Sequence, residues 1–499
     1  MSVSLPEMTP VTELTDKELS QQWETINWDI AKKIVNNLQS RIASAAKNKD
    51  WKRVSKLRRL LTRSFYAKVL AVLKVTKNKG GKTPGVDGII WTTPFEKMRA
   101  ALSLTSKGYH AKPLKRKYIP KKNGKMRPMS IPTCQDRAMQ TLHALALSPV
   151  ESATGDKTSF GFKLYRSTKD ACAYLHTCMS RKLAPKWVVE GDIKSCYDEI
   201  DHNWILENIP MHKQVLRESL KAGYIEEHHQ FPTEKGTPQG GTVSPIIANM
   251  TLNGLETVIA KKFYSKPDGT IDKTHRNKHR VNFVRFADDF VITADSEEVA
   301  YEIINTVKTF LEPRGLRLSD EKTRVTNIDD GFDFLGWNFR KYDGKLLIKP
   351  SADSQNGVIS KIREIIHKAK AWDQERLIQM LNPIIRGWAQ YHNHAVSKAV
   401  FSKMDNVVYN MLVSWAKRRH PNKGTKWIMD KYWHKCGNRK YVFSTESNTL
   451  ERFSTTKIVR HRLARLDKDP FIDNEYFEKW KVMEYHRKKR ISIPSTVLN

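Results

Sequence analysis

Three aspartates at the ends of apolar segments are the residues of this chain best placed to do chemistry. Asp288 and Asp289 interrupt the apolar stretch 283–294, and Asp192 ends the apolar run that begins at Trp187. Adjacent acids between two short strands can also be an ordinary hairpin turn, because aspartate is a common turn residue. Strands this apolar instead place the acids at the edge of a buried sheet, where a divalent cation would relieve their repulsion.

Such a set of acids predicts a metal-dependent phosphoryl transfer site. Three carboxylates on two neighbouring strands can hold two Mg²⁺ ions roughly 4 Å apart. One ion would lower the pKa of a primer 3′-hydroxyl, and the other would steady a triphosphate and the leaving pyrophosphate. We expect the metal site to consist of Asp192, Ile193, Asp288 and Asp289, with the three aspartates as the catalytic residues.

The segments around these acids read as strands and helices in alternation. Residues 118–128 predict a strand, an Asn-Gly turn and a returning strand. Asp295 and Glu298 resemble a capping box for a helix that Pro313 and Gly315 end. From about residue 356 the apolar spacing is mostly helical, and the last 60 or so residues are basic and difficult to assign.

The charge of the chain favours a polyanionic partner. Lys and Arg number 87 against 53 Asp and Glu, which gives a formal net charge of +34. Nucleic acid is the expected partner, because neutralised phosphates release counterions and so drive binding. A merely basic surface, as in a ribosomal protein, is the alternative. With 499 residues, 39% of them hydrophobic, the chain can build roughly three to five folded units.

Cysteine usage and hydropathy indicate an intracellular protein. The five cysteines form no Cys-x-x-Cys pair, which argues against a zinc knuckle and against a disulfide framework. The first 20 residues show no signal-peptide pattern, and no apolar run approaches the roughly 20 residues that span a bilayer. We expect a soluble protein of the bacterial cytoplasm or nucleoid, with no membrane partner.

The ordered motifs resemble those of group II intron reverse transcriptases. The stretch 189–202, Val-Glu-Gly-Asp-Ile-Lys-Ser-Cys-Tyr-Asp-Glu-Ile-Asp-His, resembles the first palm motif of that family. Phe286-Ala287-Asp288-Asp289 resembles the second, usually written Tyr-Ala-Asp-Asp. Phe286 keeps the aromatic ring and loses only a hydroxyl, so we expect activity to survive. The similarity runs from about Trp23 to Trp433, which is most of the chain.

The resemblance implies a pocket for deoxynucleoside triphosphates. The loop 236–245, Gly-Thr-Pro-Gln-Gly-Gly-Thr-Val-Ser-Pro, is similar to the family's nucleotide-pocket motif, and the aromatic residue five after Asp192 resembles its gate against a ribose 2′-hydroxyl. The alternatives are that Tyr197 is a core residue and that Lys121 and Arg127 are ordinary surface charges. For Lys322, a structural role is as plausible as contact with the triphosphate. The expected nucleotide-binding residues are Lys121, Arg127, Tyr197, Gln239 and Lys322.

Further blocks resemble the fingers, the primer grip and the thumb of the family. Asp136-Arg137-Ala138-Met139-Gln140 and Ser159-Phe160-Gly161-Phe162 match blocks of the fingers and upper palm, but 163–167 reads Lys-Leu-Tyr-Arg-Ser where the family usually has Arg-Pro-Gly-Arg-Ser. The expected primer grip is Phe334, Leu335, Gly336 and Trp337. The expected RNA-binding residues of the thumb are Arg386, Trp388, Lys417, Arg418 and Arg419, although a plain packing helix with a charged outer face would look similar.

The expected fold is an α+β right-hand polymerase with fingers, a palm, a helical thumb and basic appendages at both ends. The expected division is 1–85 as an N-terminal helical RNA-binding extension, 86–190 as fingers, 191–349 as palm with interleaved fingers segments, 350–433 as thumb or maturase domain, and 434–499 as a basic region that binds DNA or is a disordered anchor. After Trp433 only Cys436 remains and the histidines lack ligand spacing, so we expect no His-Asn-His nuclease.

The resemblance implies an RNA-directed DNA polymerase that uses two Mg²⁺ ions. Its expected partners are an intron RNA, an RNA template, a DNA primer or target DNA, and dNTPs, and its expected further roles are assisting splicing as a maturase and supporting intron mobility by target-primed cDNA synthesis. Three alternatives stay open: a splicing cofactor without polymerase activity, a domesticated reverse transcriptase in phage defence or DNA repair, and an RNA-dependent RNA polymerase. Intact Asp192, Asp288 and Asp289 argue against the first, and Tyr197 argues against the last.

Overall fold

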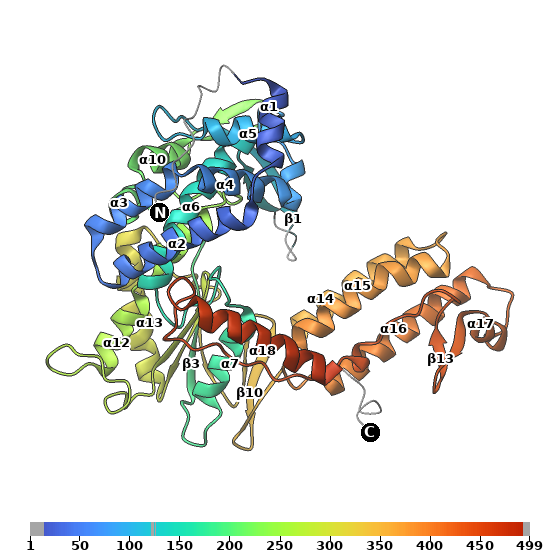
Figure 1. Ribbon diagram of the computed structural model, residues 1–499. Helices are drawn as coiled ribbons and strands as arrows, with labels where there is room; N and C mark the ends of the chain where they lie inside the picture. Colours follow the sequence, from blue (N-terminus) through green and yellow to red (C-terminus); the bar gives the residue numbers. More distant parts are fainter. Residues whose placement is uncertain (1–13, 121–123, 125, 493–499) are drawn as a thin grey trace.

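A four-stranded antiparallel sheet forms the centre of the molecule (Figure 1). The computed structural model describes residues 14–120, 124 and 126–492. The strands of this central sheet follow the order β6-β7-β3-β8. Their bounds are β3 Trp187–Asp192, β6 Asn282–Phe286, β7 Asp289–Ala294 and β8 Arg324–Asn327. The apolar runs that predicted strands around the three aspartates therefore lie side by side, with β3 between β7 and β8.

Helices cover this sheet because its strands are apolar on both faces. Helix α13 packs on β3 and β7, and α7 packs on β6. The bounds are α7 Thr168–Met179, α11 Ser244–Leu252, α12 Leu255–Tyr264 and α13 Glu297–Leu311. Helix α13 is the one expected before Pro313 and Gly315, but its N-cap is Ser296, whose hydroxyl accepts from the Val299 amide, and not Asp295. The cap falls one residue later because Ser296 has the extended backbone from which a side chain can reach the first turn.

A second sheet contains the strand–turn–strand expected at 118–128. Its order is β2-β1-β4-β5, and β1 and β2 pair antiparallel from Lys115↔Ile131 to Pro120↔Met126. The bounds are β1 Leu114–Pro120, β2 Met126–Ile131, β4 Tyr224–Glu226 and β5 His229–Phe231. The short helices α8 Cys196–Glu199, α9 His202–Asn208 and α10 Lys213–Lys221 connect β3 to β4. Asn123, at the expected turn, lies outside the described residues.

The N-terminal helices form a layer around one buried helix, α6. Its 21 residues, Cys134–Thr154, are buried on nearly every face, and α2, α3 and α4 all pack against it. The bounds of the layer are α1 Asp16–Glu24, α2 Trp28–Lys47, α3 Trp51–Arg63, α4 Phe65–Lys77 and α5 Pro94–Ser103. Their apolar faces join one continuous core with α13 and the central sheet.

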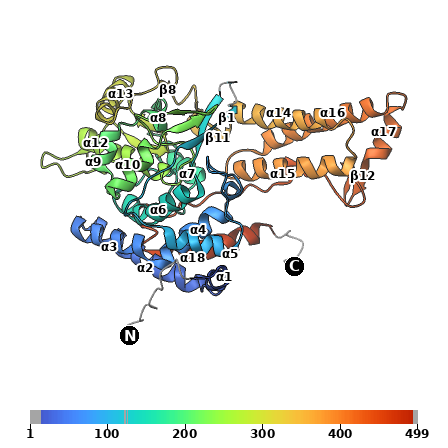
Figure 2. The same cartoon turned by 90° about the horizontal axis from the view of Figure 1, so that it is seen from above.

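The helices of the segment expected to be the thumb, for which we keep that name, have a core of their own and project away from the rest of the molecule (Figure 2). Their bounds are α14 Ala352–Lys368, α15 Gln374–His392, α16 Lys398–Arg419 and α17 Thr425–Tyr432. A three-stranded antiparallel sheet, β11-β10-β9, lies between this bundle and the central sheet. Its strands are β9 Phe332–Phe334, β10 Trp337–Tyr342 and β11 Lys345–Pro350.

The segment after the thumb folds back onto the body of the molecule. The hairpin β12 Trp433–Cys436 and β13 Arg439–Phe443 caps the thumb, and helix α18 Asn474–Ser492 lies against the body (Figures 1 and 2). In between, the Val459 amide donates to the Asn393 carbonyl and the Arg166 guanidinium donates to the carbonyls of Ala464 and Arg465. In its described part, this segment is therefore docked.

Neither a disulfide nor a membrane-spanning helix is found in the described residues. All five cysteines lie in described parts of the chain, and each is a free thiol. Among the described residues, no helix is both long enough and apolar enough to cross a membrane.

Candidate active site

Two of the three aspartates face each other across neighbouring strands. Asp192 ends β3, Asp289 begins β7, and the antiparallel register pairs them directly. The Cβ atoms of cross-strand partners lie about 5 Å apart, so the two carboxylates come together where β3 ends and β7 begins. The sheet register therefore brings together acids that are 97 positions apart in the sequence.

Asp288 joins them from the turn between β6 and β7. Ala287, just before it, has φ of +59°, a left-handed conformation that is uncommon for a residue with a side chain. Burial, and then the charge of Asp192, raises the pKa of Asp288. Burial, and then the charges of Asp288 and Asp192, raises the pKa of Asp289 to about 7, although its side chain keeps contact with solvent. Asp288 and Asp289 thus resist ionisation beside Asp192, which is the situation that a bound cation relieves.

Lys322 supplies a cation beside this cluster. Its ammonium lies 2.9 Å from an Asp192 carboxylate oxygen, and this hydrogen bond, with the nearby acids, raises the pKa of Lys322. The chain places it there through an isolated bridge between Ile193 and Leu318 and a hydrogen bond from the Ser319 amide to the Asp192 carbonyl.

The donor set suits Mg²⁺ by its chemistry. Carboxylate oxygens and substrate phosphates are the ligands that Mg²⁺ prefers, and Asp192, Asp288 and Asp289 offer only oxygen. Within the described part of the chain, no group of three or more His, Cys, Asp and Glu side chains already has a metal-binding arrangement. Lys322 donates to one oxygen of Asp192, so this lysine and a divalent ion would compete for that oxygen.

A cleft of about 930 Å³ opens in front of the acids. It contains most of the residues expected to bind metal or nucleotide, with Asp289 outside its lining. The expected residues that line it are Arg127, Asp192, Ile193, Tyr197, Gln239, Asp288 and Lys322. Lys121, expected to act with Arg127, lies outside the described residues.

The glycine-rich loop 236–245 forms one wall of the cleft. The Thr237 amide donates to the Tyr197 carbonyl at 2.6 Å, and the Ser130 amide of β2 donates to the Gln239 carbonyl at 2.8 Å. A Cβ at Gly236 would lie 2.6 Å from the Asp198 backbone, so this approach requires glycine. The loop thereby fixes the distance between the β1–β2 hairpin and the residues after β3.

Gln239 and Tyr197 both line the cleft, and Gln239 has a partner that sequence reasoning missed. Its amide donates to both carboxylate oxygens of Asp198, at 3.0 and 3.2 Å. Asp198 belongs to the first palm motif, so its position next to Tyr197 was the available signal. Burial, and then the charge of Asp288, raises the pKa of Tyr197, whose hydroxyl therefore stays protonated.

Comparison with known proteins gives three family models in a fixed order along the chain. Residues 23–104 match the N-terminal domain of reverse transcriptase, residues 119–339 match reverse transcriptase (RNA-dependent DNA polymerase), and residues 356–433 match the group II intron maturase-specific domain. The chain belongs to the group II intron reverse transcriptases. No nuclease model is among these three matches.

Curated relatives of the reverse transcriptase include intron-encoded proteins. Group II intron-encoded protein LtrA of Lactococcus lactis subsp. cremoris is 30% identical over 329 residues, which are 54% of this chain and 54% of LtrA. Protein YkfC of Escherichia coli is 28% identical over 339 residues, which are 61% of this chain and 87% of YkfC. The match thus spans about half the length of LtrA and most of YkfC.

Among solved structures, one chain of a telomerase from Candida albicans in complex with a fragment of telomeric RNA matches with a TM-score of 0.36. The sequence identity is 13%, and the match covers 66% of this chain and 62% of that chain. A score this low supports no argument about the reverse transcriptase.

The expected primer grip of the reverse transcriptase is a tight hairpin between β9 and β10. Leu335 and Gly336 form its tip, both with positive φ, as a type I′ turn requires. Phe334 and Trp337 lie at its base and are buried in the core beneath the sheet, so only the tip is available to a primer. The tip lines a groove of about 810 Å³ shared with the thumb residues Trp388 and Tyr391.

The expected RNA-binding residues of the thumb divide by exposure. Lys417 and Arg418 are exposed, and Arg386 is exposed but paired with Glu451. Arg419 donates to the carbonyls of Lys370 and Trp372 and holds the α14–α15 connection. Trp388 is half-buried, and its indole donates to the Ser354 hydroxyl. For Arg419 and Trp388, these contacts support the packing interpretation at least as well as RNA binding.

Proposed function

We propose that this reverse transcriptase copies RNA into DNA in the cleft between the β1–β2 hairpin and the central sheet. The observation that carries the proposal is the register of β3 against β7, which sets Asp192 opposite Asp289 with Asp288 beside them at the rim of the cleft. Asp192, Asp288 and Asp289, with Ile193, would hold two Mg²⁺ ions. When bound, these ions activate a primer 3′-hydroxyl and neutralise the phosphates of a dNTP.

The residues of the chain orient the nucleotide. Arg127, on the returning strand of the hairpin, reaches the cleft and would neutralise the triphosphate together with Lys121. Tyr197 would stand under the sugar and exclude a ribose 2′-hydroxyl, and Gln239 would lie beside the base-paired nucleotide. Lys322, released from Asp192 when metal binds, would face the triphosphate.

The match of residues 356–433 to the maturase-specific domain supports RNA binding and assistance of splicing as further proposed roles. We propose that the exposed Lys417 and Arg418 contact phosphates of the intron RNA, and that the RNA performs the splicing chemistry. Target-primed cDNA synthesis at a DNA site, with the basic segment 434–499 on the DNA, is the finer proposal.

The same proposal assigns fingers to 86–190, palm to 191–349 and thumb to 350–433, with an RNA-binding extension at 1–85. These segments are the expected divisions of a right-hand polymerase. The separate core of residues 358–453 supports the boundary before the thumb.

Primer extension with purified protein tests the proposal. The reaction contains Mg²⁺, dNTPs and an RNA template with an annealed DNA primer, and Asp288→Ala is run beside the wild type. We expect extended cDNA from the wild type and a loss of at least about 1,000-fold in the variant, since one metal ligand is removed. No product from a wild type that still binds RNA tightly would favour the splicing-cofactor function instead.

A further inference from the structure

The strand that leads into the catalytic turn carries a fully buried arginine. Arg285 lies on β6, two residues before Ala287, and its side chain has 0% exposure. The guanidinium donates to the Ala287 carbonyl at 3.1 Å, to the Asn249 side chain at 3.3 Å and to the Asn253 side chain at 2.8 Å. It therefore touches the backbone of the turn that presents Asp288 and Asp289.

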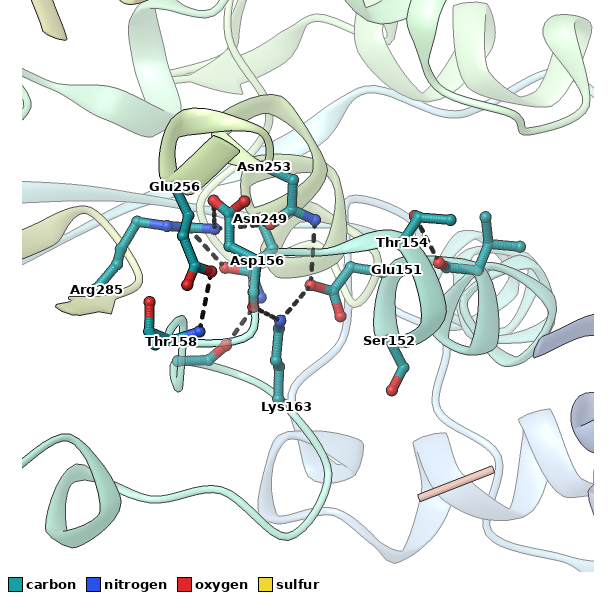
Figure 3. A network of polar contacts seen from close by, with 12 residues as sticks. Glu151, Ser152, Thr154, Asp156, Thr158, Lys163, Asn249, Asn253, Glu256 and Arg285 are labelled. Carbon is teal, nitrogen blue, oxygen red and sulfur yellow. Dashed lines mark hydrogen bonds and ion pairs between the residues drawn. The ribbon is translucent and has the colours of Figure 1, made fainter. Parts of the chain in front are cut away.

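The charge of Arg285 is balanced inside a buried polar network (Figure 3). Asp156 lies 3.9 Å from the guanidinium, and its other oxygen accepts from the Gly254 amide. Glu256 accepts from the Thr158 amide, and Lys163 lies 3.6 Å from Glu151. Burial lowers the pKa of Arg285 while these acids act in the opposite direction, and a guanidinium remains charged across the usual pH range.

The turn also has a second close contact, with the backbone at Gly161. A Cβ placed on Gly161 would lie 2.3 Å from the Ala287 amide nitrogen, so the backbone of 160–162 presses directly against the turn. Asn249 links the two supports, because its amide donates to the Gly161 carbonyl while its oxygen accepts from Arg285.

A buried charge at this position needs a reason, because an apolar side chain would fill a core at lower desolvation cost. Ala287 has a left-handed φ, which costs a residue with a Cβ about 1 kcal/mol or more and needs support from its surroundings. A planar guanidinium can hold one carbonyl and two side-chain oxygens at fixed angles, which an ammonium cannot.

We propose that Arg285 is a positioning residue of the polymerase: its guanidinium fixes the Ala287 carbonyl and so sets the direction in which Asp288 and Asp289 present their carboxylates to metal. The inference rests on the proposed polymerase site, and it concerns a residue that touches neither metal nor nucleotide. Asn249 and Gly161 take part in this positioning, because Asn249 hydrogen-bonds both Arg285 and Gly161, and Gly161 packs against Ala287.

The test compares Arg285→Lys with Arg314→Lys in the full-length protein. Arg314 is a partly buried arginine whose guanidinium donates to the carbonyls of Thr251 and Phe310 and not to that of Ala287. It also interacts with the charge of Asp156, so it controls both for loss of packing and for a changed cation near that acid. Primer extension gives kcat, the KM for dNTP and the Mg²⁺ concentration at half-maximal rate. Mn²⁺ binding is followed separately by electron paramagnetic resonance, with Asp288→Ala as the baseline.

We expect Arg285→Lys to lower kcat and weaken Mn²⁺ binding about 10-fold each, with KM for dNTP within about twofold of wild type. Arg314→Lys should keep wild-type metal dependence. Wild-type kcat and Mn²⁺ affinity in a folded Arg285→Lys would overturn the inference. The inference would also be overturned if Arg285→Lys and Arg314→Lys, with equal shifts in thermal midpoint, lost kcat and Mn²⁺ affinity to the same extent.

Two further results keep the test decisive. If Arg285→Lys does not fold, Gly161→Ala displaces the turn without changing charge, and it should also weaken Mn²⁺ binding; wild-type affinity there would count against the proposal. If the wild type binds Mn²⁺ but extends no primer, the proposed function fails, while the Mn²⁺ affinities still decide the role of Arg285.

Discussion

At the scale of single residues, Tyr197 is the proposed gate of the cleft against a ribose 2′-hydroxyl. Tyr197 lines the cleft with Asp192 and Asp288, and its backbone carbonyl anchors the glycine-rich loop through Thr237. The backbone of Tyr197 is therefore held by this loop, which supports the proposed position of its ring.

Replacing Tyr197 by valine is expected to admit ribonucleotides. Removing the ring opens space beside the sugar, so discrimination between dNTP and rNTP should fall about 10- to 100-fold, a loss of roughly 1–3 kcal/mol. Single-nucleotide incorporation on an RNA template measures the ratio of kcat/KM values. Tyr197→Phe keeps the ring and should keep the discrimination; if Tyr197→Val also keeps it, Tyr197 is a core residue and no gate.

At the scale of elements, two junctions fix the thumb and the C-terminal segment to the body. The first is an aromatic cluster in which Trp337 of β10 stacks on Tyr391 of α15 at 4.6 Å, with His392 and His394 against its edge. Burial, and then the charge of Lys169, lowers the pKa of His392 to about 3. His392 is thus neutral, and its Nε2 lies 2.9 Å from the Ser354 hydroxyl.

Acid is therefore expected to weaken this thumb junction. In the unfolded chain the pKa of a histidine is about 6.5. Between pH 6.5 and 3, position 392 is therefore protonated in the unfolded chain and neutral in the folded protein. The contribution of His392 to the free energy of unfolding is complete above pH 6.5 and falls by about 2 kcal/mol at pH 5. Thermal unfolding of the thumb, followed by tryptophan fluorescence at pH 7 and pH 5, measures it.

His392→Gln should lose less stability than the wild type over that interval, because glutamine does not titrate. His486→Gln, at an exposed position of α18, is the control and should behave as wild type. An identical pH dependence in wild type and His392→Gln would show that His392 contributes nothing to the acid sensitivity.

The second junction seats α18 on the segment 163–167, where the sequence departs from its family. Phe477 is fully buried and stacks on Tyr165 with ring centres 4.9 Å apart. Arg166, at a position where the family also has arginine, donates to two carbonyls of the C-terminal segment. The departure from the family motif thus coincides with the docking site of this segment.

Phe477→Ala is expected to release α18. Truncating a buried phenylalanine costs about 3 kcal/mol, which is comparable to the stability of a docked helix. Amide hydrogen exchange over 474–487 should speed up at least about 10-fold in this variant. Tyr485→Ala, at a ring that is 64% exposed, should leave exchange unchanged. Equal protection in Phe477→Ala and wild type would mean that the segment is held elsewhere.

At the scale of the whole molecule, the net charge of +34 makes RNA binding a salt-dependent process. The basic residues differ in how available they are to RNA phosphates, because some are exposed and others donate hydrogen bonds to backbone carbonyls. Arg418 is exposed on α16, whereas its neighbour Arg419 donates to the carbonyls of Lys370 and Trp372.

Arg418→Ala should reduce the slope of log affinity for intron RNA against log salt concentration by about 0.7, the value for one lost phosphate contact. Arg419→Ala should leave that slope unchanged and lower the thermal midpoint of the thumb. Filter binding at four or more salt concentrations measures the slope. A full slope in Arg418→Ala would remove this residue from the RNA interface.

Local sequence patterns predicted the fold well where they were regular. The apolar runs around Asp192 and Asp288-Asp289, the hairpin at 118–128 and the helix before Pro313 were all confirmed, because strand alternation and turn residues are local signals. The basic end of the chain had no such periodicity, and its helix α18 is amphipathic only around a few anchors such as Phe477.

The sequence by itself determined the family, the three acids and the order of the motifs, since these depend on residue types at fixed spacing. Only the tertiary structure decided that Asp192 faces Asp289, that Lys322 pairs with Asp192, and that Arg285 donates to the Ala287 carbonyl. Strand register and the burial of a charge depend on contacts between residues far apart in the chain. No local pattern specifies such contacts, because the free energy of a buried ion pair is set by its surroundings.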